Sequence, residues 1–379
     1  MDKGTIVYIG GFELPDKNAA AHRVVNNGKI LRDLGYDIIF IGISKNSNPG
    51  ISTSKILENN FGFTTYSFRY PEKLLDWFSY ITSIKQFIDI IERCNNVQGV
   101  ILYNFPAISL HKMIIYCHQR KIKCICDVTE WYLPKGGNKI RDLIKKIDTW
   151  YRMKILHHKT DGVIVISRYL QNYYMDSIKT VFLPPLTDLN EKKWIKQDSI
   201  SNMNTLNLVY AGSPGNKDKI SILINSLMFV EREYHLDIVG ITKTDYLREN
   251  PRHEYFLLNN EKISFHGRLT HRQTLDYVKR ANYSCFFRDN DLSTIAGFPT
   301  KFAEAISCGT PVITNNTSNI SEYIKDNNNG ILIEEINYII MANILNNLDP
   351  HINTTNNIFH YENYTCKMKK FIDSIFSNS

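Results

Sequence analysis

The stretch "GFPTKFAEAISCGTPVI", residues 297–313, places a loop, a short helix and a strand next to one another. The loop 297–299 contains Gly and Pro, which interrupt regular structure. Apolar residues then recur at helical spacing, with Lys301 and Glu304 in the first turns of the expected helix. The Gly-Thr-Pro segment 309–311 ends this helix, because glycine favours helix C-termini and proline cannot continue one. The apolar residues that follow begin a strand.

The same alternation of short apolar strands and amphipathic helices runs along most of the chain. Continuous apolar strands separated by helices are typical of a parallel sheet covered on both faces. We therefore predict an α/β fold with two doubly wound, Rossmann-like domains that face a central cleft, where ligands of such folds bind. Expected strands are 5–11, 37–43, 99–105, 123–128 and 162–167 in the first half, and 206–212, 234–241, 261–269, 283–288 and 310–315 in the second.

A polar, proline-containing segment, "LPPLTDLNEKKWIKQDSISNMN", interrupts this alternation. We interpret it as a linker between domains. The predicted organisation is a first domain at 1–185, a linker at 186–205 and a second domain at 206–358. Residues 359–379 are expected to include a helix that could cross back to the first domain.

The amino-acid composition limits the binding partners and the cellular location that we expect for the protein. The net charge of +7 over 379 residues is modestly basic and compatible with anionic partners such as nucleotide phosphates or lipid headgroups. No nucleic-acid partner is expected, because the basic residues form no known module and the aromatic residues are spread through core-like runs. Seven cysteines in mostly apolar runs favour reduced thiols and a cytoplasmic location. We expect neither a signal peptide nor a membrane-spanning helix, since no apolar run reaches about 18 residues.

In the second half, glycines and charged residues gather at strand ends and in the loops that follow them. Main-chain N–H groups of glycine-rich turns and helix N-termini suit phosphate oxygens, and lysine and arginine add the charge that a diphosphate needs. A carboxylate one turn into a helix can accept hydrogen bonds from a ribose diol. Together these features predict a nucleotide-diphosphate site built from Gly212, Ser213, Gly215, Lys217, Lys219, Gly267, Arg268, Arg288, Gly297, Thr300, Lys301 and Glu304.

These residues resemble the donor-site signature of GT-B glycosyltransferases, in particular the large retaining family four. The family pattern P-x-K-x-x-E-A-x-x-x-G-x-P-V-I, then Glu and then N-G, is matched by Pro299, Lys301, Glu304, Ala305, Gly309, Pro311, Val312, Ile313, Glu322, Asn329 and Gly330. The resemblance is strong over 206–333 and weaker over 1–205. It implies that a nucleotide diphosphate-sugar is the donor substrate, that the anomeric configuration is retained, and that neither a metal nor another cofactor is needed.

The resemblance also implies residue roles. Glu304 would hold the ribose hydroxyls, and Lys219 and Lys301 would bind the diphosphate; these three are the candidate catalytic residues. The turn from Gly267 through Arg268 to Leu269 would present main chain to the base. The loop of Gly297, Phe298, Pro299 and Thr300 would lie along the sugar and distal phosphate.

Two departures from the family pattern bear on the donor. Ala296 stands where the family often has a second Glu, which affects recognition of the sugar. Ser213 stands where the family often has Arg, and Arg288 or Arg268 would then supply the missing charge. Sugar hydroxyls could instead meet the main chain of 296–299, Asp289 or Asp291. We interpret "DND", residues 289–291, as a polar loop rather than a metal motif.

On the acceptor side, the resemblance places Gly10, Gly11, His22 and Arg23, after the first strand, at the cleft. Asp127, Glu130 and Trp131 lie at the end of the strand at 123–128, which faces the same cleft. Acidic groups there could accept the proton of the acceptor hydroxyl or bind its sugar hydroxyls. The alternatives are a surface or interface histidine at position 22, and a helix cap at Asp127 or Thr129 beside a packed tryptophan. Ser167 is expected to cap the helix that follows it.

Residues 135–159 combine an apolar helical stripe with interleaved cations. One interpretation is an interfacial helix on anionic lipid. The other is a helix whose apolar face lies in the first-domain core while its basic face is solvated. Residues 71–91 are a second candidate of this kind.

Taken together, the sequence predicts a glycosyltransferase whose acceptor is a saccharide, lipid-linked by family analogy, in cell-surface polysaccharide assembly. The expected location is cytoplasmic or peripheral at the inner face of the plasma membrane. Two alternatives remain open: a GT-B nucleotide-sugar epimerase, and a non-catalytic partner subunit, the latter motivated by Ala296 and Ser213.

Overall fold

The structure is a computed structural model of the chain. It describes residues 3–45, 61–133, 136, 139–195, 205–215, 217–325, 328–350, 354 and 356–377. The chain divides into two compact units: unit 1 is Met1–Leu186 with Tyr361–Ser379, and unit 2 is Thr187–His360. Part of the predicted linker, residues 196–204, lies outside the described residues, as do 135, 137 and 138 of the basic stretch.

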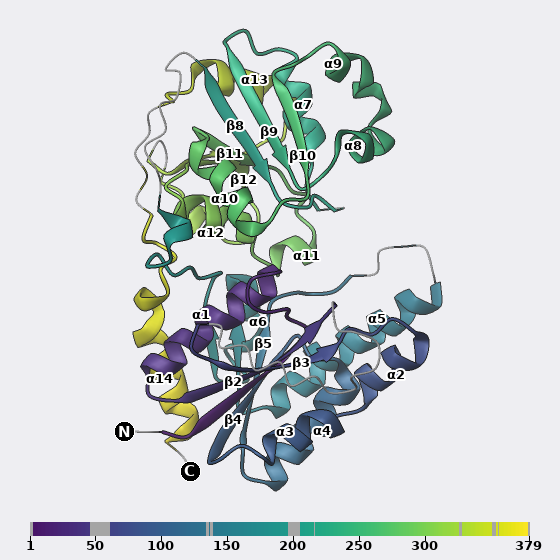
Figure 1. Ribbon diagram of the computed structural model, residues 1–379, viewed down its shortest axis with the longest axis vertical. Helices are drawn as coiled ribbons and strands as arrows, with labels where there is room; N and C mark the ends of the chain where they lie inside the picture. Colours follow the sequence, from purple (N-terminus) through teal and green to yellow (C-terminus); the bar gives the residue numbers. More distant parts are fainter. Residues whose placement is uncertain are drawn as a thin grey trace. The chain divides into compact units, whose positions relative to one another are not determined.

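Unit 1 is built on a seven-stranded parallel sheet in the order β3-β2-β1-β4-β5-β6-β7 (Figure 1). Its strands are β1 (Thr5–Gly10), β2 (Asp37–Ser44), β3 (Thr64–Arg69), β4 (Val97–Tyr103), β5 (Lys123–Val128), β6 (Gly162–Val165) and β7 (Thr180–Phe182). In the sheet centre, Ile6 lies opposite Ile38 on one side and Gly99 on the other. The five strands expected in this half are confirmed. The edge strands β3 and β7 were not predicted, because they are short or half-polar and lack the continuous apolar pattern of central strands.

The helices of unit 1 connect these strands. They are α1 (Ala19–Asp33), α2 (Leu74–Thr82), α3 (Lys85–Ile91), α4 (Ala107–Gln119), α5 (Lys139–Tyr151), α6 (Arg168–Tyr174) and α14 (Thr365–Phe376). After α5 the chain continues through a π turn, Arg152–Leu156, and a 3₁₀ turn, His157–Lys159. The Ser167 side chain accepts a hydrogen bond from the Leu170 N–H, so the predicted cap of α6 is confirmed.

Unit 2 has a six-stranded parallel sheet in the order β10-β9-β8-β11-β12-β13. Its strands are β8 (Leu206–Ala211), β9 (Tyr234–Val239), β10 (Ile263–Gly267), β11 (Tyr283–Phe286), β12 (Val312–Asn315) and β13 (Gly330–Ile333). Its helices are α7 (Ile220–Leu227), α8 (Lys243–Glu249), α9 (Glu254–Leu258), α10 (His271–Arg280), α11 (Leu292–Ile295), α12 (Thr300–Ser307) and α13 (Tyr338–Asn347). The loop, helix and strand expected over 297–313 are present, and Gly309 ends α12 with a φ of 72°.

Each sheet therefore reverses its strand order once, beside its first strand. β1 lies between β2 and β4, and β8 lies between β9 and β11. Loops at the carboxyl ends of neighbouring strands diverge at such a reversal and leave room for a ligand. In unit 2, the loops after β8 and β11 carry most of the predicted donor residues.

The last helix of the chain, α14, packs against unit 1. Phe371, Ile372 and Ile375 are buried in the same core as the strands of that sheet. Gly162 at the start of β6 allows this approach, because a Cβ there would lie 2.7 Å from Ile375 Cδ1.

We expect Ile375→Ala to lower the free energy of unfolding by about 2–5 kcal/mol, because it removes buried methyl groups and leaves a cavity. Urea unfolding followed by circular dichroism measures this change. Lys369→Ala, on an exposed position of the same helix, should leave the free energy of unfolding almost unchanged. Equal effects of the two substitutions would contradict the packing described for α14.

Candidate functional site

The loops after β8, β9 and β10 are joined through their main chains. The Gly212 N–H donates to the Val239 carbonyl at 3.0 Å, and the Gly240 N–H donates to the Gly267 carbonyl at 2.7 Å. Gly240 has a φ of 113°, and a Cβ there would lie 2.3 Å from the Gly212 oxygen. Only glycine permits this approach. The loops that carry Ser213 and Arg268, both exposed, are thereby held at one edge of the sheet.

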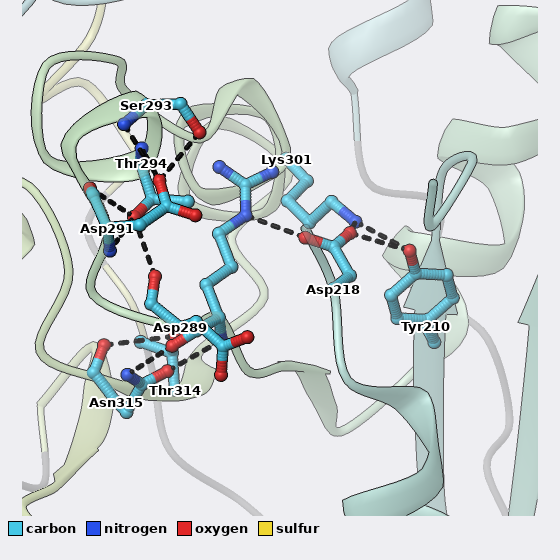
Figure 2. Close-up of polar contacts among 10 residues, drawn as sticks. Tyr210, Asp218, Asp289, Asp291, Ser293, Thr294, Lys301, Thr314 and Asn315 are labelled. Atoms are coloured by element: carbon cyan, nitrogen blue, oxygen red, sulfur yellow. Dashed lines mark hydrogen bonds and ion pairs between the residues drawn. The ribbon is translucent and has the colours of Figure 1, made fainter. Parts of the chain in front are cut away.

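A buried carboxylate, Asp218, gathers the charged side chains of this edge (Figure 2). Its Oδ1 accepts a hydrogen bond from Arg288 Nε at 2.6 Å. Its Oδ2 accepts from the Tyr210 hydroxyl at 2.7 Å and forms an ion pair with Lys301 Nζ. Lys301 Nζ also donates to the Tyr210 hydroxyl at 3.0 Å. Two cations thus share one carboxylate, which leaves the cluster with a positive charge.

Four elements of unit 2 position the members of this cluster. Tyr210 lies on β8, and Lys301 lies in the first turn of α12. Asp218 pairs with Arg288 as an isolated antiparallel bridge of main chain. Asn315, the last residue of β12, accepts from the Arg288 N–H at 2.9 Å and donates to the Arg288 carbonyl at 2.8 Å. The carboxyl ends of β8, β11 and β12 and the start of α12 therefore meet at these side chains.

Burial and pairing shift the pKa values of the cluster. Burial alone would raise the pKa of Asp218, but the Lys301 and Arg288 cations outweigh it and hold that pKa below its usual value. Burial lowers the pKa of Lys301 to about 8, against the opposing effect of the Asp218 carboxylate. Burial, and then the neighbouring Asp218, raise the pKa of Tyr210, so its hydroxyl stays protonated. Asp218 is therefore ionised at neutral pH, and Lys301 changes charge at mildly alkaline pH.

Lys219 lies outside this cluster. Its main-chain N–H donates to the Phe287 carbonyl at 2.8 Å, and its Nζ pairs with Asp289 Oδ2 at 2.7 Å. Both side chains of this pair are substantially exposed. Asp291 caps α11 by accepting hydrogen bonds from two main-chain N–H groups of that helix. Both outer residues of "DND" thus have protein partners.

The loop before α12 is largely buried. The Gly297 carbonyl accepts from the Ser318 hydroxyl at 2.6 Å, and Pro299 is the N-cap residue of α12. The Phe298 ring packs in an aromatic cluster with Phe302, Tyr323 and Phe359. The side chain of Phe298 therefore lies in the core, so any contact it makes with a ligand would come from its main chain.

Among the other donor candidates, Lys217, Leu269 and Thr300 are half-buried. Glu304 is half-buried too, and one of its oxygens lies 3.4 Å from His271 Nε2. Ala296, at the position where the resemblance expects Glu, is fully buried. The structure thus brings Lys301 together with Arg288 and close to Gly212, whereas Lys219 and Glu304 have partners of their own.

The acceptor-side candidates lie in unit 1, where two of them form a buried ion pair. Arg23 donates from Nη2 to Asp127 Oδ1 at 2.7 Å and from Nη1 to the Leu183 carbonyl at 2.9 Å. Tyr8 and Asn27 also donate to the Asp127 carboxylate. This network ties β1, α1, β5 and the segment after β7 together. Arg23 and Asp127 therefore point into the unit, where they can position a loop but have little exposed surface.

The remaining acceptor-side candidates surround this network. Gly10 lies close to β4, since a Cβ there would be 2.7 Å from Tyr103 Cβ, and a Cβ at Gly11 would be 3.3 Å from the Tyr80 hydroxyl. His22 and Glu130 are half-buried. Trp131 packs edge-on against Tyr169 and Tyr173 of α6.

The helix-cap alternative for Thr129 is wrong. Thr129 exchanges hydrogen bonds with the Asn104 side chain, and the first helix described after it begins at Lys139. Asp127 likewise bonds to the buried network rather than to a helix N-terminus.

Three members of the site were missed by the sequence analysis: Asp218, Tyr210 and Asn315. Asp218 lies between two lysines in "NKDK", a pattern that is typical of a solvent-exposed loop. No signal in the sequence distinguishes it, because its pairing with Arg288 joins segments that are far apart in sequence. Tyr210 and Asn315 could not be recognised from the sequence either, because they lie in expected strands and match no site motif.

Comparisons with known proteins agree with this geometry. Residues 192–348 match the family model of glycosyl transferases group 1. The match covers less than half of the chain but includes the whole Asp218 cluster. No curated protein sequence matches the chain.

Solved structures match over both units. Sucrose-phosphate synthase from Thermosynechococcus elongatus is 16% identical with a TM-score of 0.73, and the alignment covers 100% of both chains. A glycosyltransferase from Rickettsia africae is 16% identical with a TM-score of 0.70, again over 100% of both chains. Alr3699/HepE from Anabaena, in complex with UDP and glucose, is 14% identical with a TM-score of 0.66 over 98% of this chain and 99% of that one. These matches show that the chain has the GT-B fold.

We expect Asp218→Asn to lower the free energy of unfolding by about 3–5 kcal/mol at neutral pH, because it leaves two partly buried cations without a counter-charge. Lys219→Ala, which breaks the exposed pair with Asp289, should cost less than about 1 kcal/mol. Urea unfolding of both variants measures the difference. An Asp218→Asn protein as stable as the parent would show that the carboxylate does not hold the cluster together.

Proposed function

We propose that the protein transfers a sugar from a nucleotide diphosphate-sugar to a saccharide acceptor, with retention at the anomeric carbon. The observation that supports this proposal most directly is the cationic cluster of Arg288 and Lys301. It lies at the strand-order reversal of unit 2, within the segment that matches glycosyl transferases group 1. The Anabaena structure that contains UDP and glucose makes a UDP-sugar the first donor to test.

Some N–H groups of the cluster are not used within it and could donate hydrogen bonds to a diphosphate. Lys301 Nζ carries three N–H groups, of which Asp218 and Tyr210 take two. Arg288 donates to Asp218 through its Nε. Within the described part of the chain, its two Nη groups make no hydrogen bond or ion pair with another side chain. A planar pair of Nη groups suits two phosphate oxygens at once. The Asp218 carboxylate would hold both cations in place before the donor arrives.

In the proposed reaction, negative charge grows on the diphosphate as the bond to the sugar breaks. Cations fixed in advance stabilise this charge more in the transition state than in the ground state, which lowers the barrier. The departing phosphate oxygen can take the proton of the acceptor hydroxyl, so a strong enzymic base is not required. Glu304, one turn after Lys301, is proposed to bind the ribose hydroxyls, and Lys219 to exchange Asp289 for a phosphate oxygen.

The proposed acceptor is a growing saccharide on a membrane lipid carrier, in assembly of a cell-surface polysaccharide. The basic stretch 135–159 supports this part. Among the described residues, no helix is long and apolar enough to cross a membrane. The protein would then meet its acceptor as a peripheral protein at the inner face of the plasma membrane.

We expect Arg288→Gln to weaken UDP-sugar binding about tenfold to a hundredfold, because a charge-assisted hydrogen bond is worth about 1.5–3 kcal/mol. Calorimetric titration and thermal shift against a panel of UDP-, GDP-, ADP- and TDP-sugars measure this. Arg272→Gln, at an exposed position of α10, is the matched control and should bind like the parent. Failure of every sugar nucleotide to stabilise the parent protein would overturn the proposed function. Hydrolysis or epimerisation of the donor without any acceptor requirement would favour the epimerase instead.

Binding of the diphosphate should also depend on pH. The pKa of Lys301 is lowered to about 8, so the ammonium is charged at neutral pH and becomes neutral as the pH rises through that value. We expect the dissociation constant for UDP to rise about tenfold between about pH 7 and about pH 9.5. Lys301→Arg keeps its charge over this range and should abolish most of that rise. A pH profile shared by both proteins would remove Lys301 from the diphosphate site.

A further inference from the structure

The outer surface of α5 is apolar. Five large apolar side chains of this helix have exposed fractions between 55% and 73%: Ile140, Leu143, Ile144, Ile147 and Trp150. The one buried residue of the helix is the small polar Thr149. A surface helix of a globular protein ordinarily turns its apolar side inward. The core interpretation of this stripe is therefore wrong, and α5 presents its apolar side to the surroundings.

The order of side chains around α5 is that of an interfacial helix. At 3.6 residues per turn, the five apolar residues fall within an arc of about 120°. Lys139 and Lys146 border this arc on one side, and Arg141 flanks it on the other. Thr149 lies on the opposite side, toward the unit. An apolar stripe with cations on both borders is the arrangement that lies flat in the headgroup region of a bilayer.

A second exposed apolar surface lies on α2. Leu74, Leu75 and Phe78 have exposed fractions from 66% to 88%, and no residue of this helix is buried. They fall within an arc of about 100° of the helix.

Both helices pack against α4, on the same flank of unit 1 (Figure 1). The Ala107 N–H of α4 donates to Asp148 of α5 at 2.7 Å, and Lys112 of α4 donates to the Thr82 carbonyl of α2. We call the exposed apolar residues of α2 and α5, with Lys139, Arg141 and Lys146 beside the apolar stripe of α5, the docking face.

We propose that the docking face binds the surface of an anionic bilayer. Three cations flank the apolar stripe, Lys139 and Lys146 on one border and Arg141 on the other. Of the two carboxylates of α5, Asp142 lies on the opposite side of the helix, and Asp148 lies near the Arg141 border. Asp142 is half-buried, and Asp148 is occupied by Arg152 and by the Ala107 N–H. An anionic bilayer meets both requirements of this face at once, because its acyl region receives the apolar side chains while its headgroups neutralise the cations.

This inference deepens the peripheral association named in the proposed function and rests on that part of it. It assigns the contact to two helices rather than to 135–159 alone. In this division, α5 supplies the charge and part of the apolar area. α2, with both Lys73 and Asp76 beside its apolar residues, supplies apolar area without a net charge.

Co-sedimentation of the full chain with lipid vesicles tests the proposal. We expect binding to phosphatidylcholine vesicles that contain about 30% phosphatidylglycerol, and little binding to phosphatidylcholine alone. Lys139→Ala/Lys146→Ala should reduce the partition coefficient on anionic vesicles about tenfold or more, since each cation near such a surface contributes a factor of about five. Ile144→Ser/Ile147→Ser and Leu74→Ser/Phe78→Ser should each reduce it as well. The controls are Lys369→Ala/Lys370→Ala on α14 and Leu258→Ser on α9, which should bind vesicles like the parent.

Three outcomes would overturn the proposal: equal binding to neutral and anionic vesicles, vesicle binding that no docking-face variant reduces, or a dimer in solution that Ile144→Ser/Ile147→Ser converts to a monomer. The last would assign the face to a second copy of the chain. Thermal shift of the same variants with UDP-sugars, in the absence of lipid, separates this proposal from the donor site. Docking-face variants that bind UDP-sugars like the parent but no longer bind vesicles would support the docking face. A parent protein that binds vesicles but no UDP-sugar would count against the proposed transferase function and not against the docking face.

Discussion

One carboxylate organises the charged edge of the sheet in unit 2. Asp218 is almost completely buried, yet it remains ionised because two cations from different parts of unit 2 donate to it. A buried charge is tolerated only when it is paired, so each of the three groups needs the others. The carboxyl ends of β8 and β11 and the first turn of α12 meet at this point, and a shift in any of them would leave a charge without its partner.

The same arrangement explains how the site can lack the arginine that the resemblance expects after β8. Ser213 is exposed and contributes no charge, but Arg288 reaches the same region from the end of β11. Its backbone is held by Asn315, so the guanidinium is positioned by the sheet rather than by a loop. Ala296 is different, because it is fully buried and its methyl group carries no polar atom that could replace the expected carboxylate.

The sequence allowed the fold and part of the site to be predicted. Buried parallel strands are continuous apolar runs, and the Gly and Pro residues of 297–313 mark the ends of α12. Asp218 could not be identified, since its burial arises from packing between β8, β11 and α12, which are far apart in sequence. The apolar stripe of α5 was recognised, but helical periodicity is the same whether a stripe faces a core or the surroundings. Only the exposed fractions of Leu143, Ile147 and their neighbours decide between the two.

The position of α14 has a consequence for the order in which the chain can fold. Unit 1 is interrupted in sequence by the whole of unit 2, and its core includes residues of α14. A ribosome synthesises α14 only after unit 2. Part of the apolar surface of the first sheet therefore stays exposed while the second domain is synthesised. Unit 2, which is continuous in sequence, can complete its own core first. We therefore expect nascent chains that end before Tyr361 to expose an unfinished first domain, the kind of surface that chaperones bind.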